Sequence, residues 1–200
     1  MENKSVIKRL ILLCIIVIAG LTVQAQESKF YIGLGAGYAS TGGDLSSDNY
    51  YQGGLHINFL NAGYRINETW GVTANIGAAG HPIDNSDSAI GISALSFGPM
   101  ISVPVSNMTL DIKPQYIARM VGVFRGDEAS ELLLENLDLF GSGFVLGNSL
   151  VMNSSQGFTW SIDADYLSGK FNKATYDGEP YDEDLTYNSF RIGLGVRYNF

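Results

Sequence analysis

The sequence of 200 residues contains a single cysteine, Cys14, and this residue lies in an apolar run near the N-terminus. Beyond that run the chain has no thiol, which excludes a disulfide framework, a zinc–thiolate site and a cysteine nucleophile. After residue 25 no apolar run approaches the ~18 residues that mark a transmembrane helix. Lysine is also scarce, because only four lysines follow residue 25.

Residues 1–25 have the features of a secretory signal peptide. Three basic residues precede an apolar run over 10–21, and Val23 and Ala25 occupy the two small-residue positions that a signal peptidase recognises. The run is too short for a helical membrane anchor, which needs ~20 apolar residues. We therefore expect cleavage after Ala25, and residues 26–200 then form one exported domain.

The exported chain is acidic. The full sequence has a formal net charge of −8, and residues 1–25 contain three basic residues and one acid, so the remainder carries −10. Binding to the nucleic-acid backbone requires clustered lysine and arginine. The composition therefore excludes nucleic acid as a partner.

Residues 26–200 show the alternation of apolar and polar residues that is typical of β-strands. Apolar residues occupy every second position over 190–200 without a fault, and over 30–38 near the other end. Three slips of this alternation, near Phe59–Leu60, near Ala94–Leu95 and within 139–146, mark places for a β-bulge. The pattern predicts eight strands, over 30–41, 53–66, 70–83, 89–106, 108–126, 137–153, 157–176 and 186–200.

The connections between these segments alternate between short and long. Such an arrangement is typical of an up-and-down antiparallel meander, with both chain ends on the side of the short turns. The short turns are expected at 67–69, 106–107 and 153–156, and the longer, mostly acidic loops at 42–52, 84–88, 127–136 and 177–185.

The tetrapeptide IGLG occurs twice, at 32–35 and at 192–195. Its surroundings give the spacing G-x-G-x-G without a following amphipathic helix, so a dinucleotide-binding loop is excluded. Glycine at alternate strand positions indicates that other groups approach closely on that face, as in the filled interior of a narrow barrel. We expect these two strands to pair and to close the barrel.

The apolar face of each segment is then directed outward. A solvated face would carry lysine and glutamate, as in a soluble sandwich or a lipocalin-like barrel, whereas the polar face here is rich in glycine. Aromatic residues near the strand ends fit the girdles of a membrane barrel, and closure leaves no unpaired edge in lipid. The sequence therefore predicts an all-β fold, a closed up-and-down antiparallel eight-stranded transmembrane β-barrel.

Three segments carry a resemblance to a known family: "QAQ" at 24–26, "FYIGLGAGYAS" at 30–40 and "RIGLGVRYNF" at 191–200. Together they resemble the small outer-membrane β-barrel family of Gram-negative bacteria, which includes OmpA-type membrane domains and OmpX-like proteins. The "QAQ" ending is similar to signals of Bacteroidetes. The resemblance implies an outer-membrane location, contact with outer-membrane lipid and lipopolysaccharide, and a barrel without a further domain. It also implies that Phe200 serves as the signal for the barrel-assembly machinery.

Charged residues fall on the expected inner face, at Asp111, Lys113, Arg119, Asp163, Asp165, Arg191 and Arg197. Burial of a single charge is very costly, so these residues are expected to pair and to plug the barrel. The alternative is a polar path for small solutes, in a narrow porin-like channel or an accessory barrel of a secretion system. Eight strands leave little bore for such a path.

Two outer segments are candidates for contact with partners. The segment 177–184 has carboxylates at Asp177, Glu179, Asp182, Glu183 and Asp184. We expect these carboxylates to lie in a solvated outer loop. The alternative is that they bind divalent cations, although they lack the spacing of a calcium-binding loop. The segment 130–136, "SELLLEN", is expected to form a short helix that packs on the barrel rim or serves in adhesion.

Catalytic candidates are few. His56 and His81 are the two histidines, and Asp84 and Ser86 lie near His81, which leaves a lipid A-modifying enzyme as a third hypothesis. No spacing indicates a metal site or a cofactor. The sequence predicts a structural or interaction role, in adhesion or envelope integrity, in which acidic outer loops contact an extracellular ligand.

Overall fold

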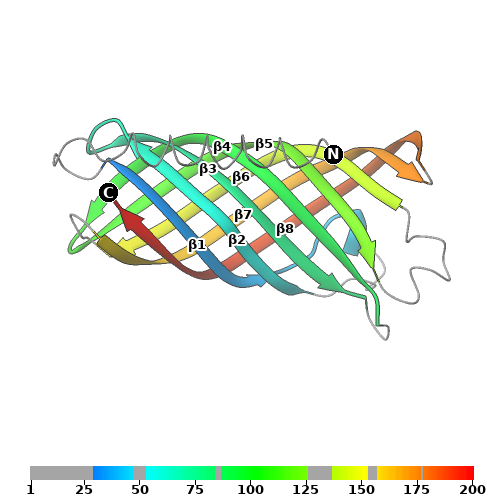
Figure 1. Ribbon diagram of the computed structural model, residues 1–200, viewed down its shortest axis with the longest axis horizontal. Coiled ribbons are helices and arrows are strands. Elements are labelled where there is room, and N and C mark those ends of the chain that lie inside the picture. The colour runs from blue at the N-terminus through cyan, green and yellow to red at the C-terminus, as the bar shows by residue number, and fades with distance from the viewer. Residues whose placement is uncertain (1–28, 47–52, 84–86, 126–136, 153–156, 177) are drawn as a thin grey trace, which may run out of the picture.

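The computed structural model describes residues 29–46, 53–83, 87–125, 137–152, 157–176 and 178–200. The expected signal peptide and the segment 130–136 lie outside these residues. In the described part, eight antiparallel strands follow one another around a closed barrel (Figure 1). The elements are β1 Phe30–Ala39, η1 Asp44–Ser46 (a 3-10 helix), β2 Gly54–Arg65, β3 Trp70–Pro82, β4 Ala89–Val105, β5 Met108–Arg125, β6 Leu137–Met152, β7 Gly157–Tyr176 and β8 Glu179–Asn199.

The two IGLG segments lie side by side where the barrel closes. β1 pairs with β8, and Gly35 lies opposite Gly195. A β-carbon on Gly195 would lie 2.6 Å from the carboxylate of Asp163, so this glycine leaves the space that the inward carboxylate occupies. The prediction that the first and last strands pair is confirmed.

The outward side chains near the start of β1 and the end of β8 are apolar and exposed. Phe158, Leu194 and Trp160 expose 75%, 63% and 60% of their surface. Large apolar side chains at such density on a surface indicate contact with hydrocarbon rather than water. The described connections at this end are short, so it corresponds to the periplasmic end of a membrane barrel.

A row of aromatic side chains lies at each end of this apolar belt. The inner aromatic row, at the periplasmic end, consists of Phe30, Phe158, Tyr198 and Phe200, whose rings are in contact. The outer aromatic row consists of Phe97, Tyr116 and Phe144, which are neighbours across β4, β5 and β6. Aromatic rows at both edges are typical of a membrane-spanning barrel.

Beyond the outer aromatic row the two faces of the sheet exchange their character. Many outward positions there are polar, as at Ser93, Lys170 and Asn188, and most of the buried inward side chains are apolar. The inward side chains form one buried cluster, which we call the outer apolar layer. Its members are Leu45, Ile90, Ile92, Ala94, Ile117, Met120, Phe124, Leu139, Leu167, Phe171, Ala174 and Tyr187. The barrel therefore leaves the hydrocarbon at the outer row and continues as a water-exposed β-structure with its own core.

This exchange explains two of the three predicted slips. At Phe59 the extra residue lies in β2 itself, as a bulge there requires. Near Ala94–Leu95 and within 139–146, β4 and β6 keep their alternation, and the extra residues lie on the neighbouring strands β5 and β7. Apolar residues change face at these two places because the surroundings change from lipid to water.

The outer end of the barrel is uneven. β1, β2 and β3 have 10, 12 and 13 residues, whereas β7 and β8 have 20 and 21. The β7–β8 hairpin consequently extends from the end opposite the C-terminus (Figure 1). The expected loop over 177–185 was wrong, because β8 begins at Glu179 and pairs with β7 from its first residue.

Candidate functional site: the barrel interior

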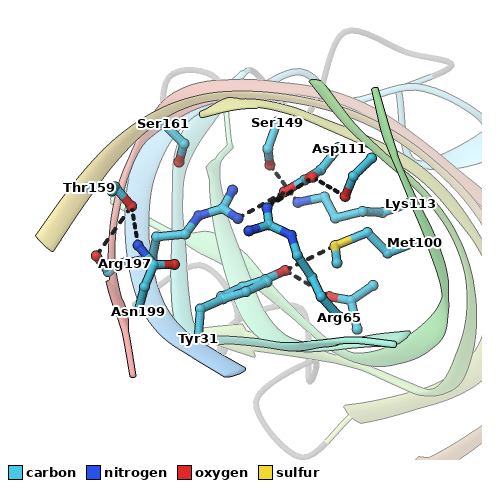
Figure 2. Close-up of polar contacts among 12 residues, drawn as sticks. Tyr31, Arg65, Met100, Asp111, Lys113, Ser149, Thr159, Ser161, Arg197 and Asn199 are labelled. Atoms are coloured by element: carbon cyan, nitrogen blue, oxygen red, sulfur yellow. Dashed lines mark hydrogen bonds and ion pairs between the residues drawn. The ribbon is translucent and has the colours of Figure 1, made fainter. Parts of the chain in front are cut away.

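Asp111 is the centre of the polar interior near the periplasmic end. Its side chain is completely buried, and its carboxylate accepts hydrogen bonds from Arg197 Nη1 at 2.9 Å and from Ser102 Oγ at 2.7 Å. Arg65 Nη2 lies 3.4 Å from both carboxylate oxygens. Two guanidinium groups and a hydroxyl thus compensate one buried charge, as burial in a narrow lumen demands (Figure 2).

An aromatic ring supports the same arginine. The guanidinium carbon of Arg197 lies 4.4 Å from the ring centre of Tyr31, in cation–π geometry. The hydroxyl of Tyr31 lies 3.4 Å from Thr73 Oγ1 and 3.6 Å from Met100 Sδ. Figure 2 shows this ring below the arginine and the carboxylate. The guanidinium of Arg197 is therefore positioned both by the Tyr31 ring and by the Asp111 carboxylate.

A second chain of contacts lies one step further along the barrel. Lys113 Nζ donates to Ser149 Oγ at 2.6 Å, and Ser149 Oγ donates to Asp163. Ser161 Oγ donates to the other carboxylate oxygen of Asp163 at 3.1 Å. Lys113 and Asp163 are therefore linked through a hydroxyl rather than by direct contact.

A small cavity lies beside this second chain, in the middle of the barrel. It measures about 10 Å³, and His56, Asp163, Asp165 and Arg191 are among its lining residues. Polar atoms of three of these side chains have no hydrogen-bond partner among the described residues, namely His56 Nε2, Asp165 Oδ1, and Nε and Nη2 of Arg191. The space is about that of one water molecule, and buried donors and acceptors of this kind are normally hydrated.

The structure places six of the seven predicted interior charges inside the barrel, and Arg119 outside. β5 has an extra residue between Ile117 and Met120, so the side chain that follows Ala118 turns to the outer surface. There Arg119 is exposed, and its guanidinium carbon lies 5.8 Å from the ring centre of Phe140. The assignment of Arg119 to the interior network was wrong because alternation does not continue across a bulge.

Several interior residues were not predicted. Arg65, Tyr31 and the serines at 102, 149 and 161 all contact the charged groups. Arg65 had a signal in the sequence, because the slip at Phe59 brings odd-numbered positions of β2 to the inner face. The serines lie on the polar face of their segments, but serine alone does not indicate a partner.

The acidic segment does not form a cluster. Glu179, Asp182, Glu183 and Asp184 belong to strand β8, where successive side chains point to opposite faces, and Asp177 lies outside the described residues. Asp184 contacts Lys170 at 2.7 Å, and Asp182 lies opposite Lys173. Within the described residues, no three His, Cys, Asp or Glu side chains are placed to hold a metal ion.

His81 lies inside the barrel rather than at a lipid-facing rim. It is completely buried in the interior at the outer end, and its Nε2 lies 2.8 Å from the hydroxyl of Tyr187. Ser88 is also buried, whereas Asp84 and Ser86 lie outside the described residues. A base for lipid modification must reach its substrate, and His81 is directed away from the lipid.

Comparison with known proteins identifies the family. The sequence profile described as "Outer membrane protein beta-barrel domain" matches residues 10–200, so the chain belongs to this family. A search of curated proteins finds no match. The fold is similar to that of Neisserial surface protein A (NspA), with 14% identity, coverage of 86% of this chain and 97% of that chain, and a TM-score of 0.54.

Two further solved structures are similar. One is Ail, the attachment invasion locus protein of Yersinia pestis, in complex with the heparin analogue sucrose octasulfate. The two sequences are 16% identical, the structural match covers 86% of this chain and 100% of the Ail chain, and the TM-score is 0.51. The other is the outer membrane protein OprG from Pseudomonas aeruginosa, 10% identical, with 88% and 98% coverage and a TM-score of 0.45. The protein is accordingly an outer-membrane β-barrel, as the sequence predicts.

Proposed function

We propose that this protein is a closed, non-conducting barrel that anchors and presents its β7–β8 hairpin to partners outside the cell. The observation that carries the proposal is the filling of the interior. The polar network around Asp111 and the outer apolar layer occupy successive levels of the lumen. Because the lumen is filled, we assign the contact with partners to the long β7–β8 hairpin at the outer end.

The charge of the hairpin indicates the kind of partner. Glu179, Asp182 and Asp184 are exposed on β8, whereas the basic residues in the outer part of this hairpin, residues 167–185, are Lys170 and Lys173. Ail was solved with a polyanionic heparin analogue. An excess of carboxylates repels such a ligand, so we propose a cationic partner, a basic peptide or protein surface, for this chain.

A narrow channel is the second candidate and has less support. A permeant ion would have to cross the outer apolar layer, in which Ile90, Leu139 and Phe171 expose at most 1% of their surface. Transfer of an ion into such a layer is very costly. In the part of the chain that the structure describes, no contact surface favours an accessory barrel of a secretion system. The burial of His81 opposes lipid A modification.

The proposal is tested by binding and by conductance. Oligolysine binding to the barrel in nanodiscs should weaken about tenfold when Glu179→Gln, Asp182→Asn and Asp184→Asn are combined, because three exposed charge contacts are lost. Glu68→Gln is the matched control, since this exposed carboxylate lies in the turn between β2 and β3 at the opposite end. Equal affinity of the triple variant and the control, or unitary conductance steps in planar bilayers, would contradict it.

A further inference from the structure

The outward surface of β1–β4 contains a groove of about 400 Å³ within the apolar belt. This volume lies in the range of pockets that hold small ligands. The groove is open to the side that faces lipid, and it begins near the periplasmic rim. Its side chains include Phe30, Ala62, Tyr64, Val72, Ala74 and Phe97.

The groove exists because two neighbouring strands carry small residues at the same level. Ala62 of β2 lies directly opposite Ala74 of β3, and this pair forms the floor. Outward positions at comparable places on β7 carry Trp160 and Ile162 instead. Two alanines in register therefore leave a depression in a belt that is otherwise built of large side chains.

The walls of the groove are held in place by other aromatic rings. Phe30 packs against Phe200, with ring centres 5.5 Å apart. Phe97 packs edge-to-face against Tyr116, with ring centres 6.2 Å apart. Both supporting rings belong to the aromatic rows, so the groove is preformed, which lowers the entropic cost of occupation.

We propose that this groove binds one acyl chain of a phospholipid from the periplasmic leaflet. The lining is apolar and continuous with the hydrocarbon-facing belt, so the occupant is a lipid chain. Lys29 lies at the periplasmic end of the groove, because it directly precedes Phe30. Its carbonyl accepts a hydrogen bond from the Arg65 amide at 2.6 Å. Lys29 is exposed at the rim beside the groove, where its ammonium group attracts a headgroup phosphate.

The turn beyond the groove is ordered and suits a headgroup region. Asn67 Oδ1 accepts hydrogen bonds from the amides of Thr69 at 2.9 Å and Trp70 at 2.7 Å. Trp70 is exposed next to this turn, at the level where amphipathic rings lie in a membrane interface. The acyl chain would thus lie in the apolar groove, and the headgroup would lie beside the polar turn at the rim.

The test is the retention of phospholipid by the purified barrel, counted by native mass spectrometry after extraction in mild detergent. Ala74→Leu fills the floor and should lower the retained phospholipid about tenfold, because it displaces about two methylene groups. Ala164→Leu is the matched control, since Ala164 faces outward on β7 opposite Ile192. Its retention should equal that of the unmodified protein.

The headgroup contact is tested separately. Lys29→Gln should weaken retention of phospholipid, whereas Lys173→Gln, at the outer end, should leave it unchanged. A heat-induced shift in SDS electrophoresis confirms that each variant is folded. Equal retention in Ala74→Leu and Ala164→Leu would overturn the proposal. So would a dimer that Ala74→Leu disrupts, because a second copy would then be the occupant.

Discussion

The guanidinium of Arg197 donates to the carboxylate of Asp111 at 2.9 Å and so joins β8 to β5 across the interior. Backbone hydrogen bonds connect only neighbouring strands of the barrel. Arg65 adds β2 to the same carboxylate. One aspartate thus links three strands that are not adjacent, which holds the cross-section of the barrel in a single shape.

Asp111→Asn should destabilise the barrel strongly. The substitution leaves Arg197 buried without its counter-charge, and loss of one partner of a buried pair costs about 3–5 kcal/mol. Arg65→Gln should cost less, about 1 kcal/mol, because the Arg65 side chain remains 25% exposed and its charge is solvated. Urea unfolding in lipid vesicles, followed by tryptophan fluorescence, measures both; equal losses would contradict the central position of Asp111.

The outer apolar layer should behave like the core of a soluble protein. Phe171→Ala removes a completely buried ring and should cost about 3–5 kcal/mol. Gly122→Ala should cost about 1–3 kcal/mol, since its β-carbon would lie 3.3 Å from Phe171 Cζ and 3.4 Å from Leu139 Cβ.

The two substitutions should compensate each other when combined. The methyl group of Gly122→Ala then occupies part of the space left by Phe171→Ala, so the loss in the double variant should be smaller than the sum of the single losses. A double-mutant cycle from unfolding free energies measures the difference. Strictly additive losses would show that Gly122 and Phe171 do not share a packed layer.

Much of the fold followed from the sequence because period-two alternation has one structural meaning over long segments. The eight strands, their antiparallel order and the pairing of the IGLG segments were predicted correctly. The start of β8 was predicted too late, because acidic residues such as Asp182 and Asp184 are typical of a solvated loop. In the structure this segment is a strand outside the lipid, where charged outward side chains are favourable.

The interior was predicted less completely, for a physical reason. One rule, apolar outside and polar inside, holds for positions such as Ile162 and Asp163, which lie within the belt. Phe171 obeys the opposite rule because its strand has left the hydrocarbon. A single sequence does not state where lipid ends, and a bulge such as that beside Arg119 changes the face without changing composition.

Asp44 should make the outer end of the barrel sensitive to acid. Its carboxylate accepts hydrogen bonds from the amide and hydroxyl of Thr186, at 2.7 and 2.8 Å, and the neighbouring Leu45 is buried in the outer apolar layer. The hydrogen bond from the Thr186 amide, followed by that from its hydroxyl, holds the pKa of Asp44 below its usual value.

The sign of the pH effect follows from that lowered pKa. A depressed carboxyl pKa contributes stability above the unfolded-state value, about 3.9, and the contribution is lost as the pH falls through the lower folded-state pKa. The protection factor of the Thr186 amide in hydrogen exchange should therefore decrease below about pH 4. Asp44→Asn should show the low protection at neutral pH as well; protection that does not change with pH would contradict this contact.

Phe200 should matter more for assembly in the cell than for the stability of the finished barrel. Its amide donates to the Phe30 carbonyl at 3.0 Å, and its ring contacts Phe30 and Tyr198 in the inner aromatic row. Phe200→Ser keeps the backbone contact and removes one partly exposed ring, so refolding into vesicles should change little. In cells, however, a C-terminal aromatic residue is the expected signal for the barrel-assembly machinery, and the folded fraction should fall severalfold.

Phe158→Ser is the matched control for this prediction. Phe158 belongs to the same inner aromatic row, and its ring centre lies 5.1 Å from that of Tyr198, but it does not lie at the C-terminus. The heat-modifiable fraction in SDS electrophoresis is compared for membranes from cells and for protein refolded in vitro. A loss confined to cells and to Phe200→Ser identifies a recognition signal. Equal losses for both variants in both settings would mean that Phe200 acts only as one ring of the row.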